Sequence, residues 1–371
     1  MRSWNSITLG EVLPFKYGKN LPASKRTHSG EYDVVSSAGI IDSHDTAFTT
    51  EPCIVIGRKG SIGSLTYCPD PVWPTDTTFY VTGTPYCDLR FGYYVLQTLP
   101  LNQMNNDSAV PGLNRNDAES LAFSLPPVSE QKTIAKVLSS FDDKIAANQR
   151  TIQSADSLRN ALWDKLLKTN TESLPLSSLA EFINGRAFTK NATGTGRVVA
   201  RIAELNSGIG SNTVFNDIEV HQNHVVLPGE LLFAWSGTLM TKRWPYDEAI
   251  VNQHIFKVLP ISKFDLWALE LIIQSQIHYF QMIAAGKATT MGHIKRADLD
   301  KTVEVPTSIP DKLNMLGNTL WMLATQAEQE NQTLAHTRDE LLPLLMSGKI
   351  TVRDAEEASA KVGVDKHEVK E

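Results

Sequence analysis

Lysine and arginine side chains occur in close pairs in both halves of this 371-residue chain. Such pairs can neutralise phosphate groups, which is the chemistry that nucleic-acid binding rewards. The formal net charge is −6, so only local basic patches, and not the chain as a whole, could serve this purpose. For any one pair, ordinary solvated surface is the alternative interpretation. The pairs are Lys16/Lys19, Lys25/Arg26, Arg58/Lys59, Lys242/Arg243 and Lys295/Arg296.

Sequence motifs of common catalytic sites are absent. There is no Walker-type phosphate loop, no GxGxxG after a strand, no HExxH zinc motif and no GxSxG nucleophile elbow. An amino-methyltransferase would need an Asn-Pro-Pro-aromatic motif, which the stretch 125–128 (Leu-Pro-Pro-Val) does not supply. Cys53, Cys68 and Cys87 form no CxxC pair. We therefore expect no metal, no cofactor and no catalytic site in this chain, with an autonomous enzyme that uses an unrecognised site as the alternative.

Composition indicates a folded protein without a membrane span. Hydrophobic residues make up 42% of the chain, which is enough to build cores. No apolar run approaches the roughly 18 to 20 residues of a membrane-spanning helix. The first residues lack the apolar region of a signal peptide. We expect a cytoplasmic protein that does not contact membranes.

The chain is built from a duplicated unit. A short strand-like stretch reaches a proline and then a long helical pattern, first at Pro126 and again at Pro306, about 180 residues later. Residues 110–115 align with 290–295. Residues 9–12, followed by Tyr17-Gly18-Lys19, align with 179–182, followed by Asn184-Gly185-Arg186. A period this long indicates domain duplication and not a solenoid.

Each half reads as a mixed α+β domain. Short β-rich runs are expected at 53–56, 78–81, 121–125, 231–234, 254–258 and 301–305, and helices at 90–101 and 264–285. The predicted fold class is α+β, with two tandem α+β domains separated by two long helices packed as an antiparallel coiled coil. The expected boundaries are 1–127 and 170–307 for the domains, 128–169 and 308–348 for the helices, and 349–371 for a C-terminal tail.

Heptad spacing defines the two long helices. Ser129 is the expected N-cap of the first, with Glu130 in its first turn, and Gly348 is the expected C-terminal cap of the second. Packing of the two helices on each other within the chain is the economical arrangement, and a coiled coil that joins two chains is the alternative. A rod of 40 residues would be roughly 60 Å long. Seam positions include Leu138, Phe141, Ile145 and Ile152 in the first helix and Leu313, Leu320, Leu334 and Leu341 in the second.

Taken together, these stretches resemble the specificity subunit of a type I restriction-modification system, over roughly residues 5–350. Each stretch alone is a moderate signal, and their order together with the duplication makes the resemblance specific. The stretches are 54–63, 72–80, 228–238, 251–256, and the helix entry formed by Pro126-Pro127 and Ser129-Glu130-Gln131.

The resemblance implies a DNA-reading subunit that performs no chemistry itself. Two target recognition domains would each read half of a bipartite sequence in double-stranded DNA. The helices would set the spacer and dock two modification subunits, which bind S-adenosylmethionine and methylate adenine. Restriction subunits that use ATP and Mg would join that core. The alternatives are the specificity subunit of a related methyltransferase or nuclease system, and a non-catalytic helical adaptor.

The resemblance also suggests site residues. Arg58 and Arg243 are candidates for guanine contacts, and Asn252 and Gln253 for adenine contacts, with phosphate or structural roles as the alternative. The full set of candidate DNA contacts is Lys19, Lys25, Arg26, Arg58, Lys59, Ser61, Thr75, Asp76, Arg115, Arg186, Ser236, Thr238, Lys242, Arg243, Asn252, Gln253 and Lys295.

Docking of partner subunits is expected at Ser129, Glu130 and Gln131 and along the helical seams. The second helix has Asp311 where the family pattern leads us to expect glutamine. The two modification subunits would therefore be held unequally.

Overall fold

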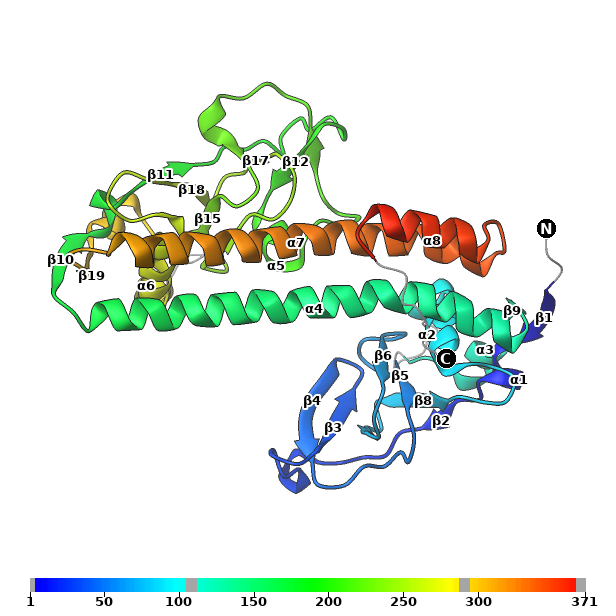
Figure 1. The fold of residues 1–371 in the computed structure, drawn as a ribbon. Helices are drawn as coiled ribbons and strands as arrows, with labels where there is room; N and C mark the ends of the chain where they lie inside the picture. Colours follow the sequence, from blue (N-terminus) through cyan, green and yellow to red (C-terminus); the bar gives the residue numbers. More distant parts are fainter. Residues whose placement is uncertain (1–3, 105–111, 287–293, 365–371) are drawn as a thin grey trace. The chain divides into compact units, whose positions relative to one another are not determined.

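The computed structural model describes residues 4–104, 112–286 and 294–364 (Figure 1). It divides into two compact units. The first unit combines Met1–Lys144 with Leu334–Glu371, and the second is Ile145–Thr333. In the part of the chain that is described, no helix combines the length and the apolar character that crossing a membrane requires.

The first unit is built on a four-stranded antiparallel sheet, in the order β2-β8-β5-β6, and a three-stranded sheet, in the order β4-β3-β7. Strands β1 and β9 pair with each other as a separate two-stranded antiparallel ribbon. The strands are β1 (Asn5–Thr8), β2 (Lys16–Tyr17), β3 (Tyr32–Ser36), β4 (Gly39–His44), β5 (Cys53–Gly57), β6 (Leu65–Cys68), β7 (Trp73–Pro74), β8 (Thr78–Thr82) and β9 (Ala122–Leu125). The short helices are α1 (Leu9–Val12), η1 (Ala23–Lys25), α2 (Leu89–Thr98), η2 (Leu101–Gln103) and α3 (Arg115–Glu119).

The second unit has the same plan. Its main antiparallel sheet has the order β11-β18-β15-β16, its second sheet the order β13-β12-β17-β14, and β10 pairs with β19. The strands are β10 (Thr171–Pro175), β11 (Ala180–Asn184), β12 (Arg197–Ala200), β13 (Phe215–Asn216), β14 (Val225–Val226), β15 (Leu231–Ala234), β16 (Met240–Arg243), β17 (Ala249–Val251), β18 (Ile255–Pro260) and β19 (Thr302–Pro306). The helices are η3 (Leu176–Ser178), α5 (Ile202–Ser207), η4 (Gln222–His224), α6 (Leu266–Gly286) and η5 (Arg296–Asp300).

Backbone hydrogen bonds confirm the duplication. The amide of Gly18 donates to the carbonyl of Thr78 at 3.1 Å, and that of Gly185 donates to the carbonyl of Ile255 at 2.9 Å. In both units this bond lies directly after the edge strand of the main sheet, β2 or β11, and joins the chain there to the neighbouring strand, β8 or β18. The predicted correspondence of Tyr17-Gly18-Lys19 with Asn184-Gly185-Arg186 is therefore correct.

Two details of the predicted alignment are wrong. Residues 9–12 form helix α1, whereas 180–184 form strand β11, so the two stretches are not equivalent. Leu9 corresponds instead to Leu176. The Leu9 amide donates to the carbonyl of Leu121, just before β9, and the Leu176 amide donates to the carbonyl of Lys301, just before β19. The alignment is displaced here because the loops differ in length, which a single sequence does not reveal.

The second misaligned stretch is 110–115 with 290–295, and most of it lies outside the described residues. In its described part, the amide of Leu113 donates to the carbonyl of Arg58, and the amide of Ile294 donates to that of Trp235. Leu113 therefore corresponds to Ile294, one residue later than the alignment placed it. The counterpart of Arg115 is accordingly Arg296 and not Lys295.

The long helices α4 (Val128–Leu167) and α7 (Asp311–Met346) pack together in antiparallel directions, as predicted (Figure 1). Within the second unit, Asn148 donates to Glu330 at 2.6 Å, beside an apolar cluster. Within the first unit, Arg338 pairs with Asp142 at 2.6 Å. The cluster in the second unit consists of Ile152, Ala155, Leu320, Ala324 and Ala327. The other seam positions are buried at Leu138, Phe141, Leu334 and Leu341 and half-buried at Ile145 and Leu313.

The ends of the helices correct two expectations. Helix α4 begins at Val128, and the carbonyl of Pro127 accepts the first helical bonds from Glu130 and Gln131, so Ser129 is not the N-cap. The predicted C-terminal cap is correct, because Gly348 has a φ of 65° and follows the last turn of α7. The expected tail is not plain coil. It contains α8 (Val352–Lys361), capped by the Thr351 hydroxyl, which accepts from the Asp354 amide.

Gln131 belongs to the internal structure of the first unit and does not face a partner. Its side chain is fully buried. The amide oxygen accepts from Asp88 N–H at 2.8 Å, and the amide nitrogen donates to the carbonyls of Tyr86 and Pro126 at 2.9 Å each. The docking role expected for this residue is therefore wrong. Asp311, which stands at the matching place in α7, is exposed.

Replacing Gln131 by alanine should lower the free energy of unfolding by about 2–4 kcal/mol, because one buried amide and two carbonyls lose their partner. Urea unfolding followed by circular dichroism measures the loss. Lys132→Ala, on the exposed side of the same helical turn, should change stability by no more than about 0.5 kcal/mol. Equal effects of the two substitutions would contradict the assignment.

Candidate nucleic-acid interface

In the first unit, several candidate residues meet at one end of the main sheet. Lys19 follows strand β2, and its amide donates to the carbonyl of Pro74. Arg58 follows strand β5, and its amide donates to the carbonyl of Thr77. Arg115 begins helix α3, two residues after Leu113, which bonds to the Arg58 carbonyl. Chain segments far apart in the sequence thus bring three cationic residues to one end of the sheet.

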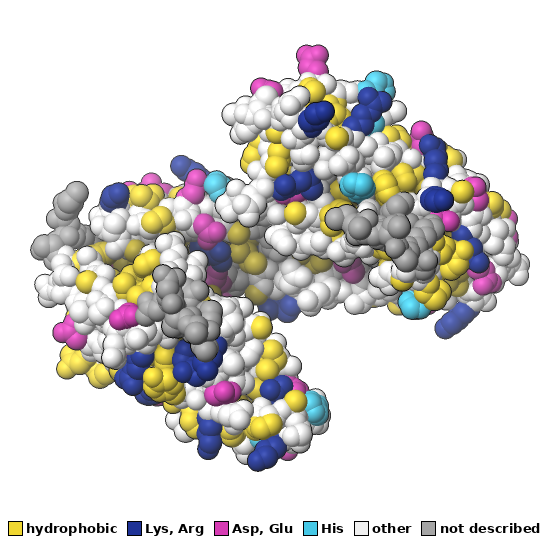
Figure 2. Space-filling view, turned by 180° about the vertical axis from the view of Figure 1, so that it is seen from behind, with side chains coloured by type: hydrophobic (Ala, Val, Ile, Leu, Met, Phe, Trp, Pro, Cys, Tyr) yellow, Lys and Arg dark blue, Asp and Glu magenta, His cyan; other side chains and the backbone are white. Residues whose placement is uncertain are grey.

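Aromatic rings lie between these cations. The guanidinium carbon of Arg58 lies 5.4 Å from the ring centre of Tyr17, and that of Arg115 lies 6.0 Å from it. The ammonium of Lys19 lies 5.7 Å from the ring centre of Phe48 and 5.9 Å from that of Trp73. Stacked cations and rings hold their charge at fixed places on the surface. Figure 2 shows Lys and Arg side chains gathered on one face of the first unit.

The loop after β5 presents further polar groups. Gly60 and Gly63 have φ values of 78° and 71°, which glycine adopts readily. At Gly63 a Cβ atom would lie 2.5 Å from the backbone nitrogen of Asn102. The loop is therefore held tightly, with Lys59 and Ser61 exposed to solvent.

The turn before β8 combines a structural and an exposed residue. Thr75 is buried, and its hydroxyl lies 2.9 Å from that of Thr77. Asp76 is exposed, and its carbonyl accepts from Arg58 Nη2 at 2.7 Å. Thr75 thus holds the turn, which contradicts a contact of its side chain with DNA in this structure, whereas Asp76 stays accessible.

Lys25 is the last residue of η1, and Arg26 follows it. Arg26 donates to the carbonyl of Leu21 at 3.1 Å and pairs with Asp42 at 3.5 Å. Lys25 is exposed.

The second unit repeats this arrangement with other side chains. The amide of Arg186 donates to the carbonyl of Val251, and the amide of Gln253 donates to that of Arg186. Arg186 and Gln253 are both exposed. Burial, followed by the charge of Arg186 and of His221, lowers the pKa of His224. The guanidinium of Arg186 is a permanent positive charge at this place.

Trp235 takes the position that Arg58 has in the first unit. Its amide donates to His254, as that of Arg58 donates to Thr77. The indole Nε1 donates to Asn184 Oδ1 at 2.8 Å, and the ring stacks on Phe256 with centres 5.7 Å apart. The second unit therefore presents a large ring where the first presents a guanidinium.

Of the remaining predicted residues of the second unit, some are exposed to solvent and others are buried. Thr238 and Lys295 are exposed, whereas Ser236 is buried. Asn252 is 8% exposed, and its buried Oδ1 has no hydrogen-bond partner among the described residues. Its backbone amide donates to Ala200. Asn252 therefore shapes the turn at the place that Thr75 takes in the first unit.

Arg243 does not belong to the surface, which corrects the prediction of a guanine contact. It is 4% exposed, and its guanidinium binds both carboxylate oxygens of Glu328, at 2.9 and 3.0 Å. It also lies 3.4 Å from Asp156 and 4.8 Å from the ring centre of Trp321. Burial opposes its charge, but the hydrogen bonds and charge of Glu328 raise the pKa of Arg243 above its ordinary value. Lys242 on the same strand is half-buried.

Two residues of this surface were missed by the site prediction. Tyr17 stands next to Gly18, in the aligned motif, and is 53% exposed. Trp235 lies in a stretch that carried the resemblance. Both could have been found from their place in the motifs.

The described residues contain no group of three or more His, Cys, Asp or Glu side chains that could hold a metal ion. Each unit instead offers an exposed set of cationic, amide and aromatic groups at one end of a sheet. Such a surface suits contacts with phosphates and base edges.

Comparison with known proteins shows which class the chain resembles. Residues 1–156 match the family model of the type I restriction modification DNA specificity domain. The specificity subunit of the type I restriction enzyme EcoprrI of Escherichia coli is 26% identical over 145 residues, 36% of this chain and 35% of that protein. A Mycoplasma pneumoniae protein described as a candidate type I specificity subunit is 25% identical over 188 residues, 48% of this chain and 49% of that protein. The chain thus spans half or less of the length of these relatives.

A solved structure extends the likeness of the fold to nearly the whole chain. The S subunit of a type I restriction-modification system from M. genitalium matches with a TM-score of 0.62 at 16% identity, over 93% of this chain and 96% of that one. The first part of the chain is thus similar to a DNA specificity domain, and the chain shares the fold of that S subunit.

Replacing Arg243 by alanine should lower the free energy of unfolding by about 3–5 kcal/mol, because the mostly buried Glu328 loses the cation that binds both of its carboxylate oxygens. Urea unfolding followed by tryptophan fluorescence measures this change. Lys242→Ala should cost no more than about 1 kcal/mol. An Arg243→Ala protein of unaltered stability that recognises a different DNA sequence would restore the base-reading assignment.

Proposed function

We propose that this chain is the DNA-reading subunit of a type I restriction-modification complex, and that each unit reads one half of a bipartite target in double-stranded DNA. The observation that carries this proposal is the repeated frame with different side chains. Arg58 and Trp235 occupy one structural position, and Tyr17 and Asn184 occupy another. A shared frame with unlike surfaces suits two half-sites of unlike sequence.

Phosphates and bases would be contacted by different residues. Lys19, Lys59, Arg186 and Lys295 are exposed cations that suit phosphate oxygens. Arg58 and Gln253 lie at the same ends of the sheets and carry fork-like donors or amide groups that suit base edges. Contacts of the first kind set the register, and those of the second kind set the sequence.

The chain would act without chemistry of its own. Modification subunits would bind S-adenosylmethionine and methylate adenine, and restriction subunits would bring ATP and Mg. The number of modification subunits is two in this proposal, one for each unit. The complex would act in the cytoplasm. The exposed surfaces of α4 and α7, and not Gln131, would receive the partners.

A methylome experiment tests the proposal. Co-expressed with its modification subunits, the chain should direct adenine methylation to one bipartite motif, read by long-read sequencing. Arg58→Ala should relax one half-site only, by about 1–3 kcal/mol of discrimination, because a base contact is lost. The matched control Lys59→Ala should weaken binding to all sequences and lower the salt slope by about one phosphate contact.

An active complex without a bipartite motif would overturn the proposal. Salt-insensitive binding of the assembled complex would instead favour the helical adaptor, since phosphate contacts depend on salt. Methyl transfer by the purified chain alone would reveal an enzyme.

The two long helices should set the spacer between the half-sites. Four residues inserted after Ala146, together with four after Gln332, add one turn to each helix, about 6 Å. The spacer should then grow by about two base pairs while both half-sites stay unchanged. An unchanged spacer in the methylome would show that the length of the helices does not set the distance between the half-sites.

The control is insertion after Ala146 alone. The Asn148–Glu330 and Asp142–Arg338 pairs define one antiparallel register. With one helix longer than the other, only one of these pairs can form. This variant should therefore be less stable than the double insertion.

A further inference from the structure

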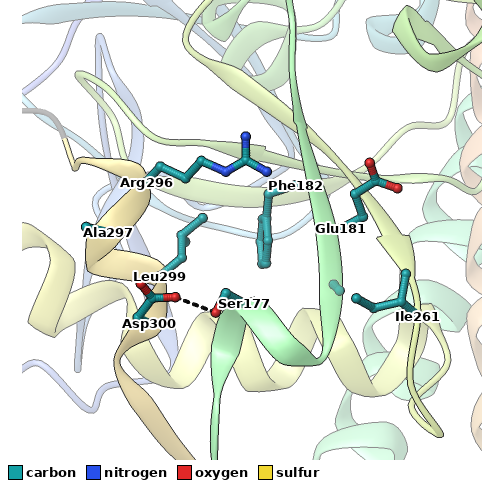
Figure 3. A pocket seen from close by; sticks show the side chains of 9 residues that line it. Ser177, Glu181, Phe182, Ile261, Arg296, Ala297, Leu299 and Asp300 are labelled. Atoms are coloured by element: carbon teal, nitrogen blue, oxygen red, sulfur yellow. Dashed lines mark hydrogen bonds between the residues drawn. The ribbon is translucent and has the colours of Figure 1, made fainter.

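A pocket of about 610 Å³ lies along the edge strand β11 of the second unit. Figure 3 shows Arg296 reaching toward the strand near Phe182, while Asp300 turns toward Ser177. Glu181 lies on the other side of the strand. The rest of the lining is largely apolar and consists of Ala180, Ile261, Ala297 and Leu299.

The first unit fills the equivalent place with its own carboxylate. Glu119 Oε1 accepts from the Phe15 amide at 2.7 Å and from Arg115 Nε at 3.0 Å. The Phe15 amide is available because Gly18 bonds to Thr78, and alternate amides of an antiparallel edge strand point away from the sheet. An edge amide and a guanidinium thus hold one carboxylate.

A glycine makes this arrangement possible. A Cβ atom on Gly10 would lie 2.8 Å from Cβ of Glu119. Such contacts are too short to persist, so a side chain at position 10 would push Glu119 aside. The reach of the glutamate to the Phe15 amide therefore depends on the absence of a side chain at Gly10.

The second unit differs at both of these positions. Ser177 stands where the first unit has Gly10, because each follows the leucine that bonds to Lys301 or Leu121. Asp300 is the last residue of η5, as Glu119 is the last residue of the equivalent helix α3. The shorter Asp300 accepts from the Ser177 hydroxyl at 2.6 Å. The pair leaves the place of the glutamate carboxylate unfilled.

The two donors are still present in the second unit. Phe182 corresponds to Phe15, because Asn184 lies opposite Phe256 as Tyr17 lies opposite Phe79. The bond from Gly185 to Ile255 makes the Phe182 amide point away from β18. Arg296, the counterpart of Arg115, has no hydrogen bond or ion pair with any residue that the structure describes.

We propose that this pocket binds one carboxylate group of an external ligand, held by the Phe182 amide and the Arg296 guanidinium. Phe182 and Leu299 offer apolar surface to the methylene groups beside the carboxylate. Glu181 and Asp300 also line the pocket, and their charges disfavour a polyanion such as a DNA backbone. The ligand class is a short aliphatic carboxylate. A glutamate side chain on a protein segment and a free small acid share this chemistry. The proposal does not depend on DNA recognition.

Amide NMR of the full chain tests it with N-acetyl-glutamate N-methylamide as the probe. The Phe182 amide signal should shift and saturate with this probe, and not with the matched N-acetyl-glutamine N-methylamide. Arg296→Gln should weaken binding by about tenfold or more, as loss of a charge-assisted contact predicts. Tighter binding of the blocked glutamate than of glutarate assigns the site to a protein side chain, and the reverse assigns it to a free acid; both support the carboxylate site.

Reciprocal substitutions provide the sharper test. S177G/D300E gives the second unit the residues of the first, so its own carboxylate should fill the pocket and abolish probe binding. G10S/E119D should make the Phe15 amide respond to the probe. Equal response to the glutamine probe, tighter binding of inorganic phosphate, or unchanged binding by S177G/D300E would each overturn the proposal.

Discussion

The candidate interface of each unit depends on one close approach of two backbone segments. A Cβ atom on Gly18 would lie 2.1 Å from the carbonyl oxygen of Thr75, and one on Gly185 would lie 2.1 Å from that of Asn252. No side chain fits there, so only glycine lets the end of the first strand lie against the turn before the second. This contact places Lys19 in one unit, and Arg186 in the other, beside the loops that carry other candidate DNA contacts.

The same backbone frame supports different surfaces in the two units. Arg58 and Trp235 follow equivalent strands, yet one carries a cation and the other an aromatic ring. Glu119 fills its surroundings, whereas the shorter Asp300 leaves a pocket. Hydrogen bonds within the backbone hold the frame, so side chains at the loops can change without disturbing it. That separation of frame and surface fits the proposal that the two units read two unlike half-sites.

The arginines fall into two groups, one buried and paired with carboxylates and the other at the surface against an aromatic ring. Arg243 and Arg159 are each 4% exposed and are paired with carboxylates, Arg159 with Glu270 at 2.5 Å. A buried cation without such a partner would be strongly destabilising. Arg58 and Arg115 instead lie against the Tyr17 ring at the surface. Adjacent residues such as Lys242 and Arg243 can thus have unrelated roles, because successive residues of a strand point to opposite faces.

Local patterns in the sequence determined most of the elements. Heptad spacing predicted α4 and α7 to within three residues at each end, and the β-rich runs matched β5, β8, β9, β15, β18 and β19. Glycine and proline positions predicted the duplication and the cap at Gly348. The tertiary structure decided which of the predicted site residues face solvent. It placed Arg243, Thr75 and Gln131 inside and added Tyr17 and Trp235 to the candidate site. Periodicity and turns depend on neighbours in the chain, whereas burial and hydrogen-bond partners depend on segments brought together only by folding.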